Sequence, residues 1–372
     1  MPRHAESPHS VPPDAPYLRK APEALSKARA AAKDGPVKDA VPLLTHLLVV
    51  DPWTHEGLAL ARQWQGRAGR DSYALLTEAG RKDRKVGLLK ALVAHLNGDV
   101  AKAVAELLSS CWFDRRLAAL EVWVFEWLVD DEALKSMVPL QVAYLIEAIA
   151  YRAADPPEAI SWQHLALRNA LALADRVDRL VAAGWKGEGE VARCSGSTIS
   201  YSRSHGTEPL GLDRLRSIAL SKLGRFEEAV TLCRSAYDQK PGWDTAVAVA
   251  NACRRSGDRL GAIRAFEQAL VHDPKDATAR LDLGDMHLQA EDWKNALRWY
   301  DEVLAQDGQH YWALPSALFC RFKLDGLEAP LDELRHLVTH SAGCTCGLHL
   351  EQMFGGGDIG ARARDLLAHL KA

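Results

Sequence analysis

The chain has 372 residues, of which 48% are hydrophobic, and a formal net charge of −3. This hydrophobic fraction excludes a wholly disordered chain, and the slightly acidic balance excludes the basic excess with which proteins neutralise the phosphates of nucleic acids. No apolar run reaches the length of about 18 residues that a membrane span needs, so we predict neither a nucleic acid nor a membrane as partner.

Residues 1–18 are polar and rich in proline and histidine. They lack the apolar stretch of a secretory signal, which predicts a flexible leader. The seven cysteines of the chain show no spacing typical of a disulfide framework, as expected of reduced thiols. Together these features predict a cytoplasmic location.

Residues 19–183 predict an N-terminal helical region in which a repeat is faintly visible. In its first unit (21–54), small residues, a glycine, leucines and a closing proline have the same spacing as in the clearer repeats later in the chain. These residues are Ala28, Gly35, Ala40, Leu44, Leu47 and Pro52. A second unit (84–116) holds the same kinds of residue at Ala91, Gly98, Ala103 and Leu107. Beyond it the spacing is lost, and we expect an irregular helical middle with a buried helix at 140–151 and a long helix at 158–183.

Five aromatic residues crowd one segment of this region: Trp112, Phe113, Trp123, Phe125 and Trp127. Our interpretation is core packing within a helix pair, and an exposed aromatic platform for a partner protein is the alternative. Several carboxylates accompany them: Glu121, Glu126, Asp130, Asp131 and Glu132. We interpret these as solvated charge and as the start signal of the next helix, rather than as a pair of catalytic carboxylates.

Residues 184–209 are rich in glycine, serine and threonine and poor in aliphatic residues. This composition predicts a long loop that links the helical region to the next one. Cys194 and His205 lie within it and offer a nucleophile and a base. No nucleophile elbow or phosphate-binding glycine pattern surrounds them, so we predict a flexible or partner-ordered loop and a protein that is not an enzyme.

A repeat stands out clearly in residues 210–324. Ala229, Ala262 and Ala296 close three similar blocks of six residues, and they lie 33 and 34 residues apart. In a helical hairpin, glycine ends the first helix, alanine lets two helices cross closely, and proline ends the second helix. The residues that fit these roles, and the aromatic residues that fill the space between hairpins, are Gly224, Gly257, Phe266, Tyr300, Pro241 and Pro274.

This pattern resembles the tetratricopeptide-repeat family. Segments 243–276 and 277–310 carry it most fully, and 210–242 is a slightly short copy. The second of these segments departs from the family at Glu291, which replaces the turn glycine, and at Gly308, which replaces the closing proline. The resemblance implies an all-α fold, a right-handed α-solenoid of helical hairpins, with the N-terminal region as a degenerate version and an irregular helical middle.

The resemblance also implies a function, because members of the family bind extended peptides in a concave groove lined by the first helix of each hairpin. The residues at these groove positions are Arg214, Asn251, Arg254, Asp285, Trp312 and Phe319, together with Leu281 and Leu288. By this resemblance Asn251 binds peptide backbone, Arg254 pairs with a carboxylate and Trp312 stacks on an apolar side chain. Asp282 and Asp285 stand where the carboxylate clamp of some members requires neutral or basic groups, which argues against a chaperone-tail receptor.

We therefore expect an adaptor or scaffold that binds a protein or peptide through this groove. A peptide-sensing regulator is the first alternative, and an accessory subunit of an enzyme is the second. The sequence does not identify the partner.

Residues 325–372 predict a helical C-terminal cap, because a solenoid needs an end with a polar outer face. Four soft ligands lie within it: His340, Cys344, Cys346 and His349. Zinc prefers thiolates and imidazoles, but the Cys-x-Cys spacing is tighter than the usual Cys-x2-Cys. We expect a cap turn without metal and a protein without cofactor, with a structural zinc site as the alternative.

Overall fold

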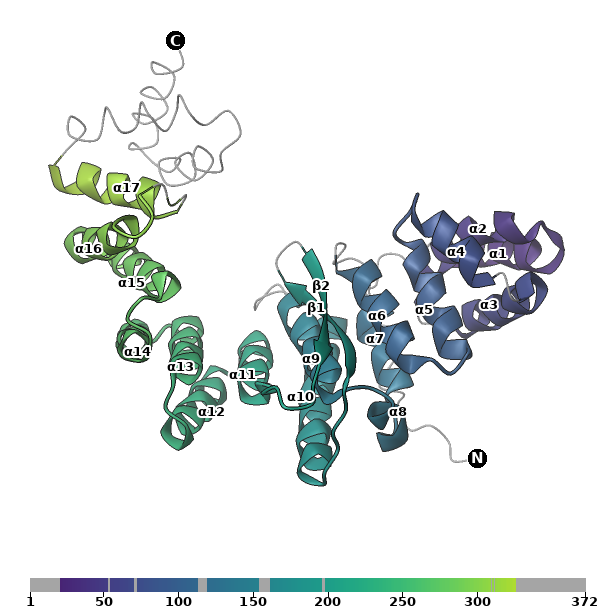
Figure 1. Cartoon of the computed structure of the whole chain (residues 1–372). Helices are drawn as coiled ribbons and strands as arrows, with labels where there is room; N and C mark the ends of the chain where they lie inside the picture. The colour runs from purple at the N-terminus through teal and green to yellow at the C-terminus, as the bar shows by residue number, and fades with distance from the viewer. Residues whose placement is uncertain are drawn as a thin grey trace, which may run out of the picture. The chain divides into compact units, whose positions relative to one another are not determined.

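The computed structural model describes residues 21–325, apart from 53, 70–71, 113–118, 154–160, 196–197, 309 and 311. Within this part the chain forms seventeen helices and one two-stranded sheet (Figure 1). It divides into two compact units, with the boundary between residues 229 and 230. The prediction of a helical-repeat fold is confirmed, and no described helix is long and apolar enough to cross a membrane. The predicted leader and the cysteine and histidine cluster of the predicted cap lie outside the described residues.

The first unit begins with six helices: α1 (Ala21–Asp34), α2 (Val37–Val50), α3 (His55–Ala68), α4 (Ser72–Gly80), α5 (Val86–Leu96) and α6 (Val100–Cys111). α1 packs against α2 and α5 against α6, which are the two faint repeat units of the sequence. Side-chain caps start two of these helices, because the Thr54 hydroxyl accepts from the Gly57 N–H at 3.2 Å and the Asp99 carboxylate from the Lys102 N–H at 3.1 Å. Local sequence thus sets where these hairpins turn.

The irregular middle contains α7 (Ala119–Trp127), α8 (Asp131–Lys135), α9 (Pro139–Arg152) and α10 (Ser161–Ala182), and α11 (Leu212–Lys222) follows later in the chain. α10 packs against α7, α9 and α11. The predicted buried helix is α9, in which nearly every side chain is buried, and the predicted long helix is α10. Both predictions are confirmed.

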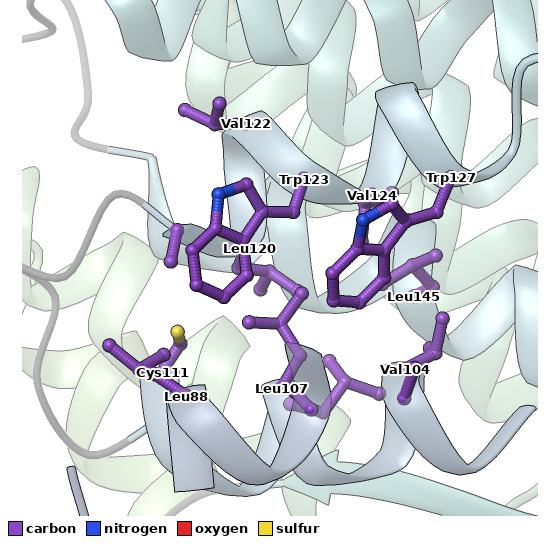
Figure 2. Packing of buried hydrophobic residues seen from close by; sticks show 14 of the residues in the cluster. Leu88, Val104, Leu107, Cys111, Leu120, Val122, Trp123, Val124, Trp127 and Leu145 are labelled. Carbon is purple, nitrogen blue, oxygen red and sulfur yellow. The ribbon is translucent and has the colours of Figure 1, made fainter. Parts of the chain in front are cut away.

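The tryptophans of α7 belong to the core. Figure 2 shows Trp123 and Trp127 side by side near Val104 and Leu107 of α6, and their ring centroids lie 5.6 Å apart. Trp123 is 1% exposed, and its indole N–H donates to the carbonyl oxygen of Pro52 at 2.5 Å. A buried indole needs such an acceptor. Core packing is therefore confirmed for these two side chains, which contradicts an exposed platform at their positions, whereas Phe113 lies outside the described residues.

One carboxylate of this segment is not solvated, contrary to our prediction. Glu121 is 7% exposed and Arg152 of α9 is 2% exposed, and the Arg152 Nε donates to the Glu121 Oε1 at 2.8 Å. Arg152 also donates to the carbonyl oxygen of Cys111. Two charges removed from water in this way each require the other. The predicted helix start is confirmed at Asp130, whose carboxylate accepts from the Ala133 N–H at 2.7 Å.

The predicted loop at 184–209 contains a β-hairpin instead. Its strands, β1 (Gly189–Ser195) and β2 (Thr198–Ser204), pair in antiparallel orientation. β1 packs against α9 and α6, and its Val191 and Ala192 are buried. The prediction was wrong because strand-forming residues are sparse among the serines here, whereas burial against neighbouring helices decides whether such a segment becomes a strand.

The second unit follows a regular order. α12 (Phe226–Gln239) begins in the first unit and is followed by α13 (Trp243–Ser256), α14 (Arg259–His272), α15 (Ala277–Gln289), α16 (Trp293–Leu304) and α17 (Ala313–Asp325). From α13 to α17, each helix packs against the next. The predicted units 243–276 and 277–310 are thus confirmed as the hairpins α13–α14 and α15–α16.

The residues that were predicted to shape these hairpins take the expected places. Four of them are completely buried: Ala262, Phe266, Ala296 and Tyr300. Gly257 has a φ of +82°, and Glu291, which replaces the turn glycine in the next hairpin, has a φ of +57°. The turn therefore keeps its left-handed conformation even where a side chain makes that conformation costly.

Candidate functional site

Five of the six predicted groove residues lie in the second unit. Asn251 and Arg254 lie on α13, Asp285 on α15, Trp312 directly before α17, and Phe319 within α17. α13 and α15 are the first helices of their hairpins, as the resemblance implied. Hydrogen bonds gather four of these five residues into two separate networks.

The first network joins α13 to α15 around Arg254. Its Nη2 donates to the Asn251 Oδ1 at 2.6 Å, and its Nη1 donates to the Asp282 Oδ1 at 2.8 Å. The Asn251 Nδ2 in turn donates to the carbonyl oxygen of Val247 at 3.0 Å. A guanidinium has more N–H donors than these two bonds use, so Arg254 is held in place while donors remain for a ligand.

Burial and charge set the protonation of this network. The side chain of Arg254 is 38% exposed and that of Asp282 is 21% exposed. Burial is the largest influence on the pKa of Asp282 and raises it, and the neighbouring Asp285 raises it further, while Arg254 opposes both. In the sequence, Asp282 was noted only because it departs from the carboxylate clamp of some family members. The structure makes it the residue that positions Arg254.

The second network lies at Asp285. Its Oδ1 accepts from the Tyr300 hydroxyl at 2.6 Å and from the Trp312 indole N–H at 3.0 Å. Burial, followed by the charge of Asp285, raises the pKa of Tyr300, so the phenol stays protonated and donates. These bonds tie α15 to α16 and to the start of α17. Contact of Asp285 or Trp312 with a peptide stays a prediction, since both already serve contacts within the repeats.

Phe319 lies in an aromatic cluster with α16. Its ring meets the ring of Trp293 edge to face, with centroids 5.7 Å apart. The Lys323 ammonium lies 5.5 Å from the Phe319 centroid and 5.4 Å from that of Trp293. Cation–π attraction of this kind holds a lysine near aromatic faces. Phe319 and Lys323 lie four residues apart on α17, but no sequence pattern links them to Trp293, so the cluster was not foreseen.

Arg214 differs from the other five residues, because it belongs to the first unit. Its Nη2 donates to the Glu147 Oε1 at 2.8 Å and its Nη1 to the Tyr151 hydroxyl at 3.1 Å, while Arg193 of β1 binds the same Glu147 carboxylate at 3.1 Å. Arg214 thereby ties α11 to α9. A continuous surface from Arg214 to the residues of the second unit stays a prediction.

The thiol and histidine of the hairpin do not form a catalytic pair. Cys194 is 5% exposed, and burial raises its pKa to about 11, so the thiol is neutral near pH 7. His205 follows Ser204, which pairs with Gly189 at the end of β1 opposite to Cys194. Within the described part of the chain, no group of three or more His, Cys, Asp or Glu residues is arranged to hold a metal ion.

Several solved structures resemble the fold at low sequence identity. A tetratricopeptide repeat protein from Parabacteroides merdae is 11% identical, with a TM-score of 0.35, over 81% of this chain and 99% of its own. Yeast Tom70 is 13% identical, with a TM-score of 0.33, over 95% of this chain and 76% of its own. The Cut9–Hcn1 hetero-tetramer of the APC/C is 14% identical, with a TM-score of 0.31, over 82% of this chain and 55% of that chain.

Comparison by sequence finds a match within the second unit. No curated protein matches the chain. The family profile described as tetratricopeptide repeat matches residues 249–311. This range covers most of α13 and the whole of α14, α15 and α16, where the buried alanines and aromatic residues of both hairpins lie. Residues 249–311 therefore match the tetratricopeptide-repeat family, the family that the sequence pattern resembles.

Proposed function

We propose that this protein is an adaptor or scaffold, and that its second unit binds an extended segment of a partner protein across α13 and α15. The observation that carries the proposal is the arrangement of Arg254, a partly exposed cation fixed by Asn251 and Asp282. A charge that is already oriented loses little conformational freedom when a ligand binds. The proposal includes no catalysis, in keeping with the neutral, buried Cys194 thiol.

The chemistry of this surface favours a ligand with an acidic and an apolar side chain. Arg254 is suited to a carboxylate, which a guanidinium binds through two parallel N–H donors. Leu281 and Leu288 of α15 are only partly buried and offer apolar contact area. Asn251 serves mainly to orient Arg254, because its amide already donates to Val247 and accepts from Arg254.

A two-step experiment tests the proposal. The intact chain is used to capture partners, and the shortest binding peptide of a captured partner is then titrated against variants. Arg254→Ala/Asp282→Asn removes the cation without leaving a half-buried carboxylate unpaired. We expect it to weaken peptide binding by about 2–4 kcal/mol, as for a hot-spot residue.

Arg264→Ala is the matched control, since Arg264 is an exposed arginine on α14, the second helix of the hairpin. It should bind the peptide like the wild type. Circular dichroism and thermal unfolding establish that both variants fold. Full binding by a folded Arg254→Ala/Asp282→Asn variant would refute the assignment to α13 and α15.

A further inference from the structure

The β-hairpin has two outer edges, and one of them is already occupied. Gln141 of α9 caps β1, because its Nε2 donates to the Ala192 carbonyl oxygen at 3.1 Å and its Oε1 accepts from the Ala192 N–H at 2.7 Å. Both main-chain groups of Ala192 therefore point away from β2. Gln141 is 4% exposed and Ala192 is 2% exposed, so without this cap two buried polar groups would lack partners.

The corresponding groups of β2 face the opposite way and are open. Ala192 pairs with Tyr201, and in an antiparallel ladder both residues of such a pair turn their N–H and C=O groups outward. The orientation returns at every second residue, so Ile199 and Arg203 also point their main-chain groups away from β1. Within the described part of the chain, β2 pairs with β1 alone, and these outward groups have no partner.

A cleft with cationic walls lies beside this open edge. It has a volume of about 440 Å³ and is lined by Ile199 and Tyr201 together with residues of the α4 to α6 region. Its charged residues are Arg81, Arg84, Lys90 and Glu106. The Glu106 carboxylate is bound by Lys90 at 2.8 Å and by the Tyr73 hydroxyl at 2.5 Å. The balance of charge in the cleft is therefore positive.

A second cleft, of about 620 Å³, meets the first at Tyr201 and adds further lysines: Lys102, Lys135 and Lys186, with Glu188 and Glu190 among them. Tyr201 lines both clefts and is 65% exposed. Exposed tyrosines commonly anchor protein interfaces, since the ring offers contact area and the hydroxyl a hydrogen bond. The open edge is thus flanked by cations and carries an aromatic anchor.

We propose that the open edge of β2 binds an extended, acidic segment of a partner protein, which adds a third strand to the hairpin. Main-chain bonds to Ile199, Tyr201 and Arg203 supply affinity, and the flanking cations supply the preference for acidic side chains. Side chains alternate between the faces of a strand, so acidic residues at every second position share one face toward the cleft. The site lies in the first unit and shares no residue with the proposed site on α13 and α15. Failure of one proposal can therefore be told apart from failure of the other.

Fluorescence anisotropy with the full chain tests this proposal with defined probes. The first probe is a short labelled peptide in which glutamate alternates with valine and threonine. A second peptide carries lysine in place of glutamate, and a third carries proline at its centre, which removes a main-chain donor. We expect the first peptide to bind, and we expect the other two to bind at least about tenfold more weakly. Equal binding of all three peptides would overturn the proposal.

Hydrogen exchange provides a readout that needs no variant. Binding of the glutamate peptide should slow the exchange of the Ile199, Tyr201 and Arg203 amides, which become hydrogen-bonded. The Ser200 and Ser202 amides should change less, because they face β1 already. If the peptide binds and the exchange of the three outward amides stays the same, the edge is not the site.

Two variants separate the strand edge from charge alone. Tyr201→Pro removes an N–H that β1 does not use, so the hairpin keeps its own ladder. We expect it to weaken peptide binding about tenfold, whereas Tyr201→Phe keeps the N–H, the aromatic ring and a strand-forming residue and should retain most binding. Circular dichroism and thermal unfolding show whether both are folded. Undiminished binding by folded Tyr201→Pro would contradict the proposal.

Charge reversal tests the cations with a matched control. Arg81→Glu/Arg84→Glu should abolish binding of the glutamate peptide, whereas Lys33→Glu/Lys38→Glu, on exposed residues of α1 and α2, makes the same change in net charge away from the cleft and should leave it intact. Single-stranded RNA of mixed sequence is the competing polyanion. If RNA binds in the same arginine-dependent way while Tyr201→Pro has no effect on either ligand, the cleft recognises polyanions and the added strand is refuted.

Discussion

A Cβ atom on Gly284 would lie 2.5 Å from the Cε1 atom of Tyr300, so the glycine of α15 packs directly on the tyrosine ring of α16. Tyr300 is completely buried, and its hydroxyl donates to Asp285 at 2.6 Å. The ring cannot move away from α15 without losing that bond. This contact therefore sets how closely the two helices of the hairpin approach.

Gly284→Ala should lower the free energy of unfolding by about 1–3 kcal/mol, because the added methyl group overpacks the contact with Tyr300. The loss should appear although alanine favours helix more than glycine does. Urea unfolding followed by circular dichroism measures it. Gly66→Ala in α3 is the control, since nothing lies within 4 Å of a Cβ atom there. Equal effects of the two substitutions would show that the contact with Tyr300 is not tight.

Glu291→Gly should stabilise the second unit by up to about 1 kcal/mol. Glu291 has a φ of +57°, a conformation that costs an L-residue with a side chain about 1–2 kcal/mol and that glycine adopts freely, although glycine loses more entropy on folding. Glu267→Gly, at an exposed position within α14, should destabilise by about 1 kcal/mol. Thermal unfolding of both variants measures the difference. If both substitutions changed the stability in the same direction, the left-handed turn at Glu291 would be contradicted.

Arg152→Ala should destabilise the first unit by about 3–5 kcal/mol, because it leaves the buried Glu121 carboxylate without its partner. Lys27→Ala is the control, because Lys27 and Glu23 form an exposed pair in α1 and such pairs contribute less than about 1 kcal/mol. Urea unfolding of both variants provides the values. A loss for Arg152→Ala as small as that for Lys27→Ala would show that water reaches Glu121 in solution.

Glu147→Gln should destabilise the protein at neutral pH and lose this effect in acid. Burial is the largest influence on the pKa of Glu147 and raises it, but the hydrogen bonds and the charges of Arg193 and Arg214 together outweigh burial, so the pKa lies below its ordinary value. A lowered pKa means that the stabilisation is complete above the unfolded-state pKa of about 4.3 and is lost as pH falls through the folded-state pKa.

The measurement is urea unfolding of wild type and Glu147→Gln at pH 7 and at several values below pH 4. The difference in free energy of unfolding should shrink with acidification, as the wild-type carboxylate takes up a proton and loses its ion pairs. A difference that is independent of pH would contradict an ionised Glu147 between the two arginines.

Residue spacing alone predicted the helical hairpins of the second unit. Ala262, Phe266 and Gly257 act within one hairpin, where the residues in contact are close in sequence, so a period of about 34 residues carries the necessary information. The same spacing placed Asn251 and Arg254 on the first helix of a hairpin. That both are polar residues of α13 outside the core followed from the repeat, without any knowledge of the contacts they make.

Only the tertiary structure decided which polar groups meet. Asp285 binds Trp312, which lies 27 residues further along the chain, and Arg152 binds Glu121, 31 residues earlier. No helical period connects such residues, and whether a carboxylate is solvated or buried depends on which helix packs above it. For that reason the sequence predicted Glu121 to be solvated and did not foresee the internal role of Asp285.

The β-hairpin shows most clearly the difference between what local sequence predicts and what tertiary contacts decide. Its residues carry a weak preference for strand, and the composition of 184–209 predicted a loop. β1 becomes a strand because Val191 and Ala192 are buried and because Gln141, 51 residues earlier, satisfies the main chain of Ala192. The sequence by itself thus determined the helical repeats, whose contacts are local, whereas burial and long-range hydrogen bonds decided the hairpin and with it the open edge at Tyr201.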